Sequence, residues 1–161
     1  MNRSVEKDRT ILVSGPSSVK LLKGKVSVLG AELSVKDKVI VRKGKSLPFE
    51  AEVSSVLEIV DGRGSEIEEV DGSTIPVSWR EAVRYLLSLP RPRTVMVLGD
   101  VDCGKTAFCT FMINNVLTSA SGISIIDADL GQSDLGPPGT IGLGLVKKPF
   151  TDLFFEKATA T

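Results

Sequence analysis

Residues 99–106 read Gly99-Asp100-Val101-Asp102-Cys103-Gly104-Lys105-Thr106 and match the phosphate-loop pattern G-x-x-x-x-G-K-[ST] at every fixed position. An apolar run at 95–98 precedes this stretch, and a predicted helix at 107–117 follows it. In that context the backbone N–H groups of residues 99–106 can surround phosphate oxygens at a helix N-terminus. Lys105 is expected to contact the β- and γ-phosphates, and the Thr106 hydroxyl to ligate Mg²⁺. The stretch therefore predicts a nucleotide phosphate site.

A second apolar run, Ile123 to Ile126, ends in Asp127 and Asp129. It lies about 20 residues after the phosphate loop, where a carboxylate that organises Mg²⁺ is expected. An extended backbone would place residues i and i+2 on one face. One carboxylate could then support the metal while the other accepts a proton from an attacking hydroxyl. The alternative is a pair of exposed aspartates at the end of a strand.

The second half of the chain predicts an α/β fold. Two fully apolar strands separated by a helix are typical of a parallel sheet that is buried on both faces. An apolar stripe from Trp79 to Leu87 predicts a further helix, which Pro90 ends. Residues 76–161 are thus interpreted as the start of a P-loop domain, with an incomplete parallel sheet.

The first half predicts strands. Short β-branched runs at 11–13, 19–22, 26–29, 39–41 and 53–60 are separated by glycine and other turn residues. Residues 1–75 are therefore predicted to form a small all-β domain, with the acidic stretch 66–71 closing it.

Composition excludes several classes of function. The chain of 161 residues has 20 basic and 20 acidic residues, which argues against a uniformly basic nucleic-acid coat. The absence of histidine excludes Ser-His-Asp catalysis and His-ligated metals. Two cysteines and a charged N-terminus favour a cytoplasmic protein, and no apolar run is long enough to span a membrane. Locally, residues 20–45 hold an excess of lysine and arginine, which is either a solvated face or a surface for a polyanion.

The combination of motifs resembles a known family. The β domain carries Gly24-Lys25-Val26-Ser27-Val28-Leu29-Gly30-Ala31-Glu32-Leu33 and Gly44-Lys45-Ser46-Leu47-Pro48-Phe49. After the phosphate loop come Asp127-Ala128-Asp129-Leu130-Gly131-Gln132-Ser133 and Pro138-Gly139-Thr140-Ile141. This order resembles the polynucleotide 5′-hydroxyl kinases of the Clp1 type, and especially their archaeal-style members.

The resemblance implies ATP-dependent and Mg²⁺-dependent phosphorylation of the 5′-hydroxyl end of RNA or DNA. Lys105 and Thr106 would correspond to the family's P-loop lysine and hydroxyl, and Asp129 to its general base. Asp127 would support the metal, and Gln132 and Ser133 would line the acceptor side. Lys45 is similar to a lysine with which the family's N-terminal domain holds adenine.

The chain departs from the family pattern in its length. It stops at 158–161, where a further buried strand is expected, and the family's lid and clasp would lie beyond Thr161. The expectation is a truncated form with little activity, whose sheet a missing C-terminal half or self-association completes. Two other functions stay open: an ATP-binding structural subunit of an RNA-processing complex, and a generic P-loop ATPase.

Overall fold

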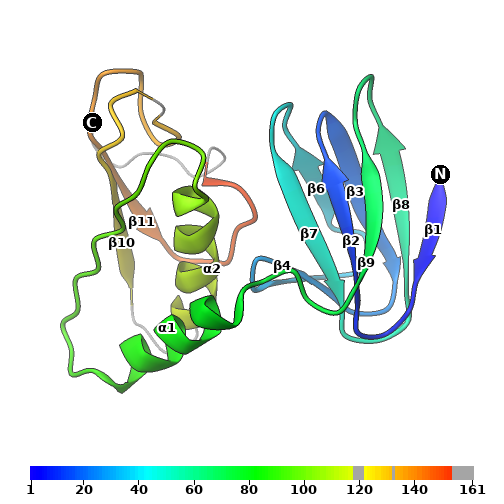
Figure 1. The fold of residues 1–161 in the computed structure, drawn as a ribbon, viewed down its shortest axis with the longest axis horizontal. Coiled ribbons are helices and arrows are strands. Elements are labelled where there is room, and N and C mark those ends of the chain that lie inside the picture. Colours follow the sequence, from blue (N-terminus) through cyan, green and yellow to red (C-terminus); the bar gives the residue numbers. More distant parts are fainter. Residues whose placement is uncertain (118–121, 132, 154–161) are drawn as a thin grey trace. The chain divides into compact units, whose positions relative to one another are not determined.

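A computed structural model describes residues 1–117, 122–131 and 133–153 (Figure 1). The chain divides into two units, Met1–Val77 and Ser78–Thr161, and each is described by itself. Among the described residues, no helix has the length and apolar character that crossing a membrane requires.

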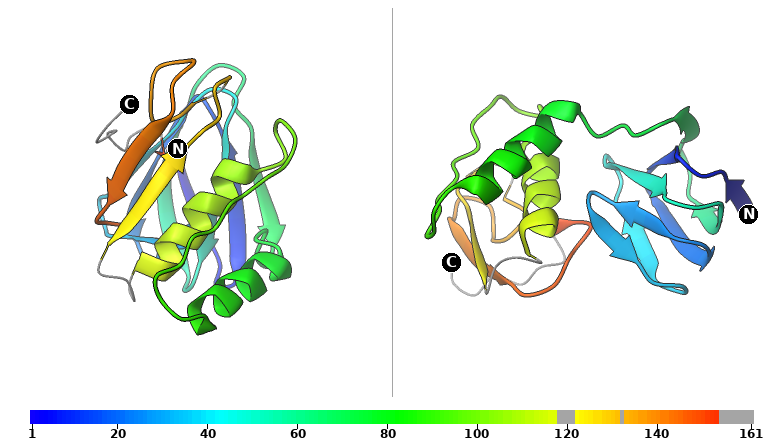
Figure 2. Two further views of the ribbon diagram at one scale, coloured as in Figure 1. Left: turned by 90° about the vertical axis from the view of Figure 1, so that its left-hand side faces the viewer. Right: turned by 90° about the horizontal axis from the view of Figure 1, so that it is seen from below.

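The first unit is a sandwich of two antiparallel sheets (Figures 1 and 2). One sheet has the order β1 (Asn2–Val5), β8 (Ser55–Asp61), β3 (Ser17–Lys23), β6 (Lys38–Val41). The other has the order β5 (Ala31–Leu33), β4 (Val26–Val28), β7 (Ser46–Ala51), β2 (Arg9–Ser14), β9 (Ile67–Asp71). Alternate residues of β3 and β8 are buried, because one face of a pleated strand points to the core. The predicted all-β fold of this part is confirmed.

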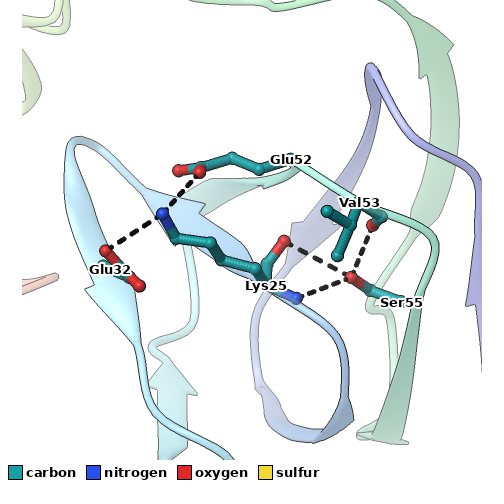
Figure 3. A network of polar contacts seen from close by, with 5 residues as sticks. All are labelled: Lys25, Glu32, Glu52, Val53 and Ser55. Atoms are coloured by element: carbon teal, nitrogen blue, oxygen red, sulfur yellow. Dashed lines mark hydrogen bonds and ion pairs between the residues drawn. The ribbon is translucent and has the colours of Figure 1, made fainter.

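The glycine-rich motif at 24–33 has a structural role in this sandwich. Gly24 has φ +101°, and a Cβ atom there would lie 2.2 Å from Ser55 Oγ, so the position requires glycine. Ser55 Oγ accepts a hydrogen bond from Lys25 N at 3.1 Å and donates to Val53 O at 2.7 Å (Figure 3). These bonds fix the passage from β3 into β4.

The side chain of Lys25 adds an ion-pair network to the same motif (Figure 3). Its Nζ lies 2.8 Å from Glu52 Oε2 and 3.4 Å from Glu32 Oε2. The hydrogen bond to Glu52, followed by the charge of Glu32, raises the pKa of Lys25. The lysine and the glutamate of this motif are therefore partners across the hairpin formed by β4 and β5.

The second unit contains α1 (Val77–Ser88), α2 (Lys105–Leu117), β10 (Ile123–Asp127) and β11 (Gly142–Val146). Arg93 closes the end of α1, since its Nε donates to Leu89 O at 2.7 Å and its Nη2 to Leu87 O at 2.9 Å. A core joins α2 and β11 to the segments around them; its buried members are Ile113, Leu135, Val146, Phe150 and Leu153.

The predicted parallel sheet is wrong for the described residues. Strand β10 pairs with β11 in antiparallel register, from Ile123 opposite Val146 to Asp127 opposite Gly142. Residues 95–98 do not form a strand; Met96 is 79% and Leu98 82% exposed. An apolar run becomes a strand only where a neighbouring strand pairs with its backbone, and no described segment offers that pairing.

Candidate functional site

The phosphate loop leads directly into the first turn of α2, as the motif requires. Asp102 has φ 58° and Gly104 φ 88°, so two of its residues adopt the left-handed conformation. A Cβ atom at Gly99 would lie 2.6 Å from Cys103 Sγ, so a side chain there would require Cys103 to shift. The loop therefore depends on both glycines of the pattern for its shape.

Lys105 and Thr106 stand at the positively polarised start of α2. The Lys105 Nζ donates to Asp100 O, at the opposite side of the loop, over 2.7 Å. An ammonium group is thus held across the loop that is expected to receive phosphate oxygens. Thr106 is half-buried, and its backbone carbonyl accepts a hydrogen bond from Thr110 Oγ1 at 2.9 Å.

Asp127, the last residue of β10, organises the loop that follows. Its Oδ2 accepts hydrogen bonds from Asp134 N at 2.8 Å, Ser133 Oγ at 3.1 Å and Leu135 N at 3.2 Å. Its Oδ1 accepts one from Asp129 N at 3.1 Å. A carboxylate that receives four donors from its own loop acts as the anchor of that loop. Sequence reasoning missed this anchoring role; a serine six residues after an aspartate that ends a strand is the signal that was available.

Asp129 lies within the anchored loop and is exposed. Its Oδ1 accepts a hydrogen bond from Gly131 N at 3.2 Å, which turns the chain back after the aspartate. Ser133 is also engaged, since its Oγ donates to Asp127 and accepts from Gly136 N at 3.0 Å. Gln132 lies outside the described residues. Of the expected acceptor-side residues, the structure therefore describes Ser133 in a supporting position.

The acidic strand end and α2 lie close enough to interact electrostatically. Cys109, one turn after Lys105, has its pKa raised by burial and further by the negative charge of Asp127. The same helix packs against Trp79, whose ring centroid is 5.2 Å from that of Phe108 and 5.9 Å from that of Phe111. The second unit thus brings Asp127 and the helix that begins with Lys105 into one neighbourhood.

Lys45 belongs to the first unit, in the turn that leads into β7. Gly44 there has φ +78°, and Lys45 O accepts a hydrogen bond from Gly15 N at 2.9 Å. Its side chain is exposed. The predicted contact of Lys45 with a nucleotide stays a prediction, because the two units are described separately.

The residues of the second unit fit ATP and Mg²⁺. A glycine-shaped loop at a helix N-terminus suits the phosphates, and Mg²⁺ in such sites takes few protein ligands beside phosphate oxygens and water. The described residues contain no group of three or more Cys, Asp or Glu side chains that could hold a metal ion alone. Thr106 and Asp127 would therefore share the metal with a nucleotide.

A phosphate loop at the start of α2, with an acidic strand end near that helix, defines a P-loop protein. Residues 99–160 match the family model described as the mRNA cleavage and polyadenylation factor CLP1 P-loop. The chain is therefore similar to the Clp1 family of polynucleotide 5′-hydroxyl kinases, archaeal homologues included, and is partial relative to them.

Two relatives and one solved structure illustrate this similarity. A polyribonucleotide 5′-hydroxyl-kinase of Pyrococcus furiosus is 39% identical over 49% of this chain and 22% of its own length. A CLP1 homolog of Culex quinquefasciatus is 30% identical over 82% of this chain and 33% of its own length. The solved structure of a Clp1p–Pcf11p complex matches 92% of this chain and 36% of the matched one, with a TM-score of 0.69 and 18% identity. The chain therefore spans about a fifth to a third of its relatives' length.

Proposed function

We propose that this chain carries the ATP site and the acceptor-activating carboxylate of a polynucleotide 5′-hydroxyl kinase. The observation that carries the proposal is the loop anchored by Asp127, which holds Asp129 within the same unit as the phosphate loop. A generic ATPase needs only a carboxylate for its metal, whereas a kinase also needs a group that takes the proton from its acceptor hydroxyl.

The phosphate loop binds and orients the nucleotide in this mechanism. The N–H groups of residues 99–106 and the start of α2 hold the phosphates, and Lys105 leaves the Asp100 carbonyl to contact the β- and γ-phosphates. Mg²⁺, when bound through Thr106 and Asp127, neutralises charge on the phosphates. Binding in this way aligns the γ-phosphorus with the incoming 5′-oxygen.

Asp129 is the general base of the proposed reaction. The 5′-oxygen forms a bond to the γ-phosphorus, its proton passes to the Asp129 carboxylate, and the bond from the γ-phosphorus to the bridging oxygen breaks to release ADP. The four donors around Asp127 fix that carboxylate in place beside the metal position, so the proposal gives Asp127 the metal and Asp129 the acceptor proton. Asp129 is exposed and able to meet an acceptor. Gln132 and Ser133 lie on the acceptor side in this proposal.

The surroundings of the site support two further proposals. Cys103 and Cys109 are free thiols, as in a reducing cytoplasm, where we place the protein. The apolar residues Val95, Met96 and Leu98 are exposed, and no described strand pairs with them. We propose that further polypeptide, from a longer product or a second copy, completes the sheet there and is needed for full activity.

The test is transfer of labelled γ-phosphate from ATP to oligonucleotides that carry a 5′-hydroxyl, RNA and DNA in parallel. The assay is done with this chain and, in parallel, with any longer product of the same gene that continues after Thr161. Asp129→Asn is expected to lower transfer about 100-fold or more while ATP still binds, and Lys105→Ala to weaken both. Asp134→Asn, a matched change in the same loop, is expected to leave transfer within about threefold of the wild type.

The same assay distinguishes the other functions. Release of inorganic phosphate that oligonucleotide does not affect would indicate a generic ATPase. Retention of ATP without turnover would indicate a structural subunit. Either result, or full transfer by Asp129→Asn, would contradict the proposal.

A further inference from the structure

The outer face of the sheet β1-β8-β3-β6 carries a cluster of lysines, Lys20, Lys23, Lys36 and Lys38, which we call the lysine face. Lys20 on β3 and Lys38 on the edge strand β6 lie directly opposite each other in the antiparallel register. Lys23 follows the irregularity in β3, and Lys36 lies in the turn before β6, where its N–H donates to Leu21 O at 2.8 Å. The four residues therefore gather around β3 and β6. These two strands are neighbours in the sheet (Figure 1).

No carboxylate among the described residues forms an ion pair with the lysine face, whereas Lys7, Arg9 and Lys25 do form such pairs. Two carboxylates lie beside these lysines in strand register or in sequence. Glu58 is the register partner of Lys20 on β8 without an ion pair, and Asp37 accepts a hydrogen bond from Ser34 N at 2.8 Å.

Acidic residues gather on the other sheet. Strand β9 carries Glu68, Glu69 and Asp71, all exposed, and Arg9 pairs with the last two. The sandwich is thus basic on the lysine face and acidic at β9, although the net charge of the whole chain is zero. Like charges directly opposite on a sheet are destabilising, so the pair Lys20 and Lys38 reduces the stability of the free protein.

We infer that the lysine face binds the sugar-phosphate backbone of the polynucleotide whose 5′ end is phosphorylated. This inference rests on the proposed function and extends it, because it adds a second contact with the same substrate. The face offers ammonium groups, small polar Ser18 and exposed aliphatic Ile40 and Val60, with no aromatic ring on which bases could stack. Binding is therefore expected to be electrostatic, independent of sequence and strongly dependent on salt.

The test measures binding without phosphoryl transfer. A fluorescein-labelled single-stranded RNA that already carries a 5′-phosphate is titrated with the full chain, without ATP, over a series of salt concentrations. A variant with Lys20→Gln, Lys23→Gln, Lys36→Gln and Lys38→Gln is compared with a control of equal charge change at exposed sites, Lys7→Gln, Arg63→Gln, Lys147→Gln and Lys148→Gln.

Each phosphate contact contributes about 0.7 to the slope of log K against log salt for a single strand. The lysine-face variant is expected to lose about 2.8 from that slope, so a fourfold rise in salt costs the wild type about 50-fold more affinity than the variant. The control is expected to keep most of the wild-type slope. The lysine-face variant is also expected to melt no lower than the wild type, which separates lost binding from lost folding.

Equal slopes for the two variants would overturn the inference, since net charge alone would then explain binding. Displacement of the RNA by polyglutamate at equal charge concentration would also overturn it, in favour of an acidic protein surface. The outcome is independent of catalysis, because the RNA used has no 5′-hydroxyl and no ATP is present.

Discussion

Replacing Asp127 by alanine tests the anchoring role of this carboxylate. The change removes the acceptor of four hydrogen bonds, from the backbone N–H groups of Asp129, Asp134 and Leu135 and from the Ser133 hydroxyl. Leu135 is 6% exposed and belongs to the core of the second unit, so water does not easily replace the lost partner of its N–H group. Hydrogen bonds to a charged acceptor contribute about 1.5–3 kcal/mol each when buried and less when water competes.

For a half-buried carboxylate with four such bonds, we expect Asp127→Ala to lower the free energy of unfolding by about 2–4 kcal/mol. In a unit of this size that corresponds to a fall in Tm of about 10 °C or more. The loss should be present with EDTA and without ATP, because it arises from the loop itself.

Thermal unfolding of the full chain, followed by circular dichroism, measures the fall in Tm. Hydrogen exchange at the Asp134 and Leu135 amides measures whether their hydrogen bonds to Asp127 are lost. Asp134→Ala is the matched control, since it removes a carboxylate from the same loop without removing the acceptor. The reasoning is refuted if Asp127→Ala melts within about 1 °C of the wild type in EDTA and both amides stay protected. Asp127 would then serve the metal alone.

Three further predictions concern other parts of the chain. Gly104 has φ +88°, so Gly104→Ala should lower the stability of the fold by roughly 1–2 kcal/mol and weaken ATP binding in titration calorimetry. The control Gly122→Ala should bind ATP like the wild type, and equal ATP binding by both variants would contradict the loop geometry. Iodoacetamide at neutral pH should label exposed Cys103 before Cys109, because burial and the charge of Asp127 raise the pKa of Cys109. Equal labelling rates in mass spectrometry would count against the position of Cys109 near Asp127. Lys25→Met should lower the free energy of unfolding at neutral pH. The difference from the wild type should vanish as the pH rises through the pKa of Lys25, which is raised above its ordinary value of 10.5. A difference that persists in denaturant titrations above that pH would disprove the ion-pair account.

The local signals in the sequence predicted α2 and much of the β sandwich well. The glycine and lysine pattern fixes the start of α2, and β-branched runs mark β2, β3 and β6. These elements follow from their own residues, because period and turn chemistry act over short distances.

Among the strands that escaped prediction, β7 and β9 did so for identifiable reasons. Strand β7 contains Pro48, which normally argues against a strand within a sheet. It is tolerated because β4 pairs only with Glu50 and Ala51 of β7, which leaves Pro48 without a neighbour on that side. Strand β9 consists largely of acidic residues and was expected to be a closing stretch; Arg9, a partner far away in the sequence, stabilises it through Glu69 and Asp71.

The parallel sheet was wrongly predicted because hydrophobicity does not determine strand pairing. Residues 95–98 have the composition of a buried strand, yet a strand also needs a neighbour, and the sequence of one segment does not indicate which neighbour is present. In the candidate site, the pattern predicted the phosphate loop and the acidic pair. It could not show that Asp127 is committed to four donors, because that follows from how residues 129–135 fold around it.

The most direct test of the central claim is the 5′-end assay with labelled ATP, applied to Asp129→Asn beside Asp134→Asn in the polypeptide that contains this chain. We predict that label reaches the 5′ end of a 5′-hydroxyl RNA, that Asp129→Asn loses about 100-fold or more of this transfer while retaining ATP, and that Asp134→Asn does not. Transfer by Asp129→Asn at the wild-type rate would contradict the account.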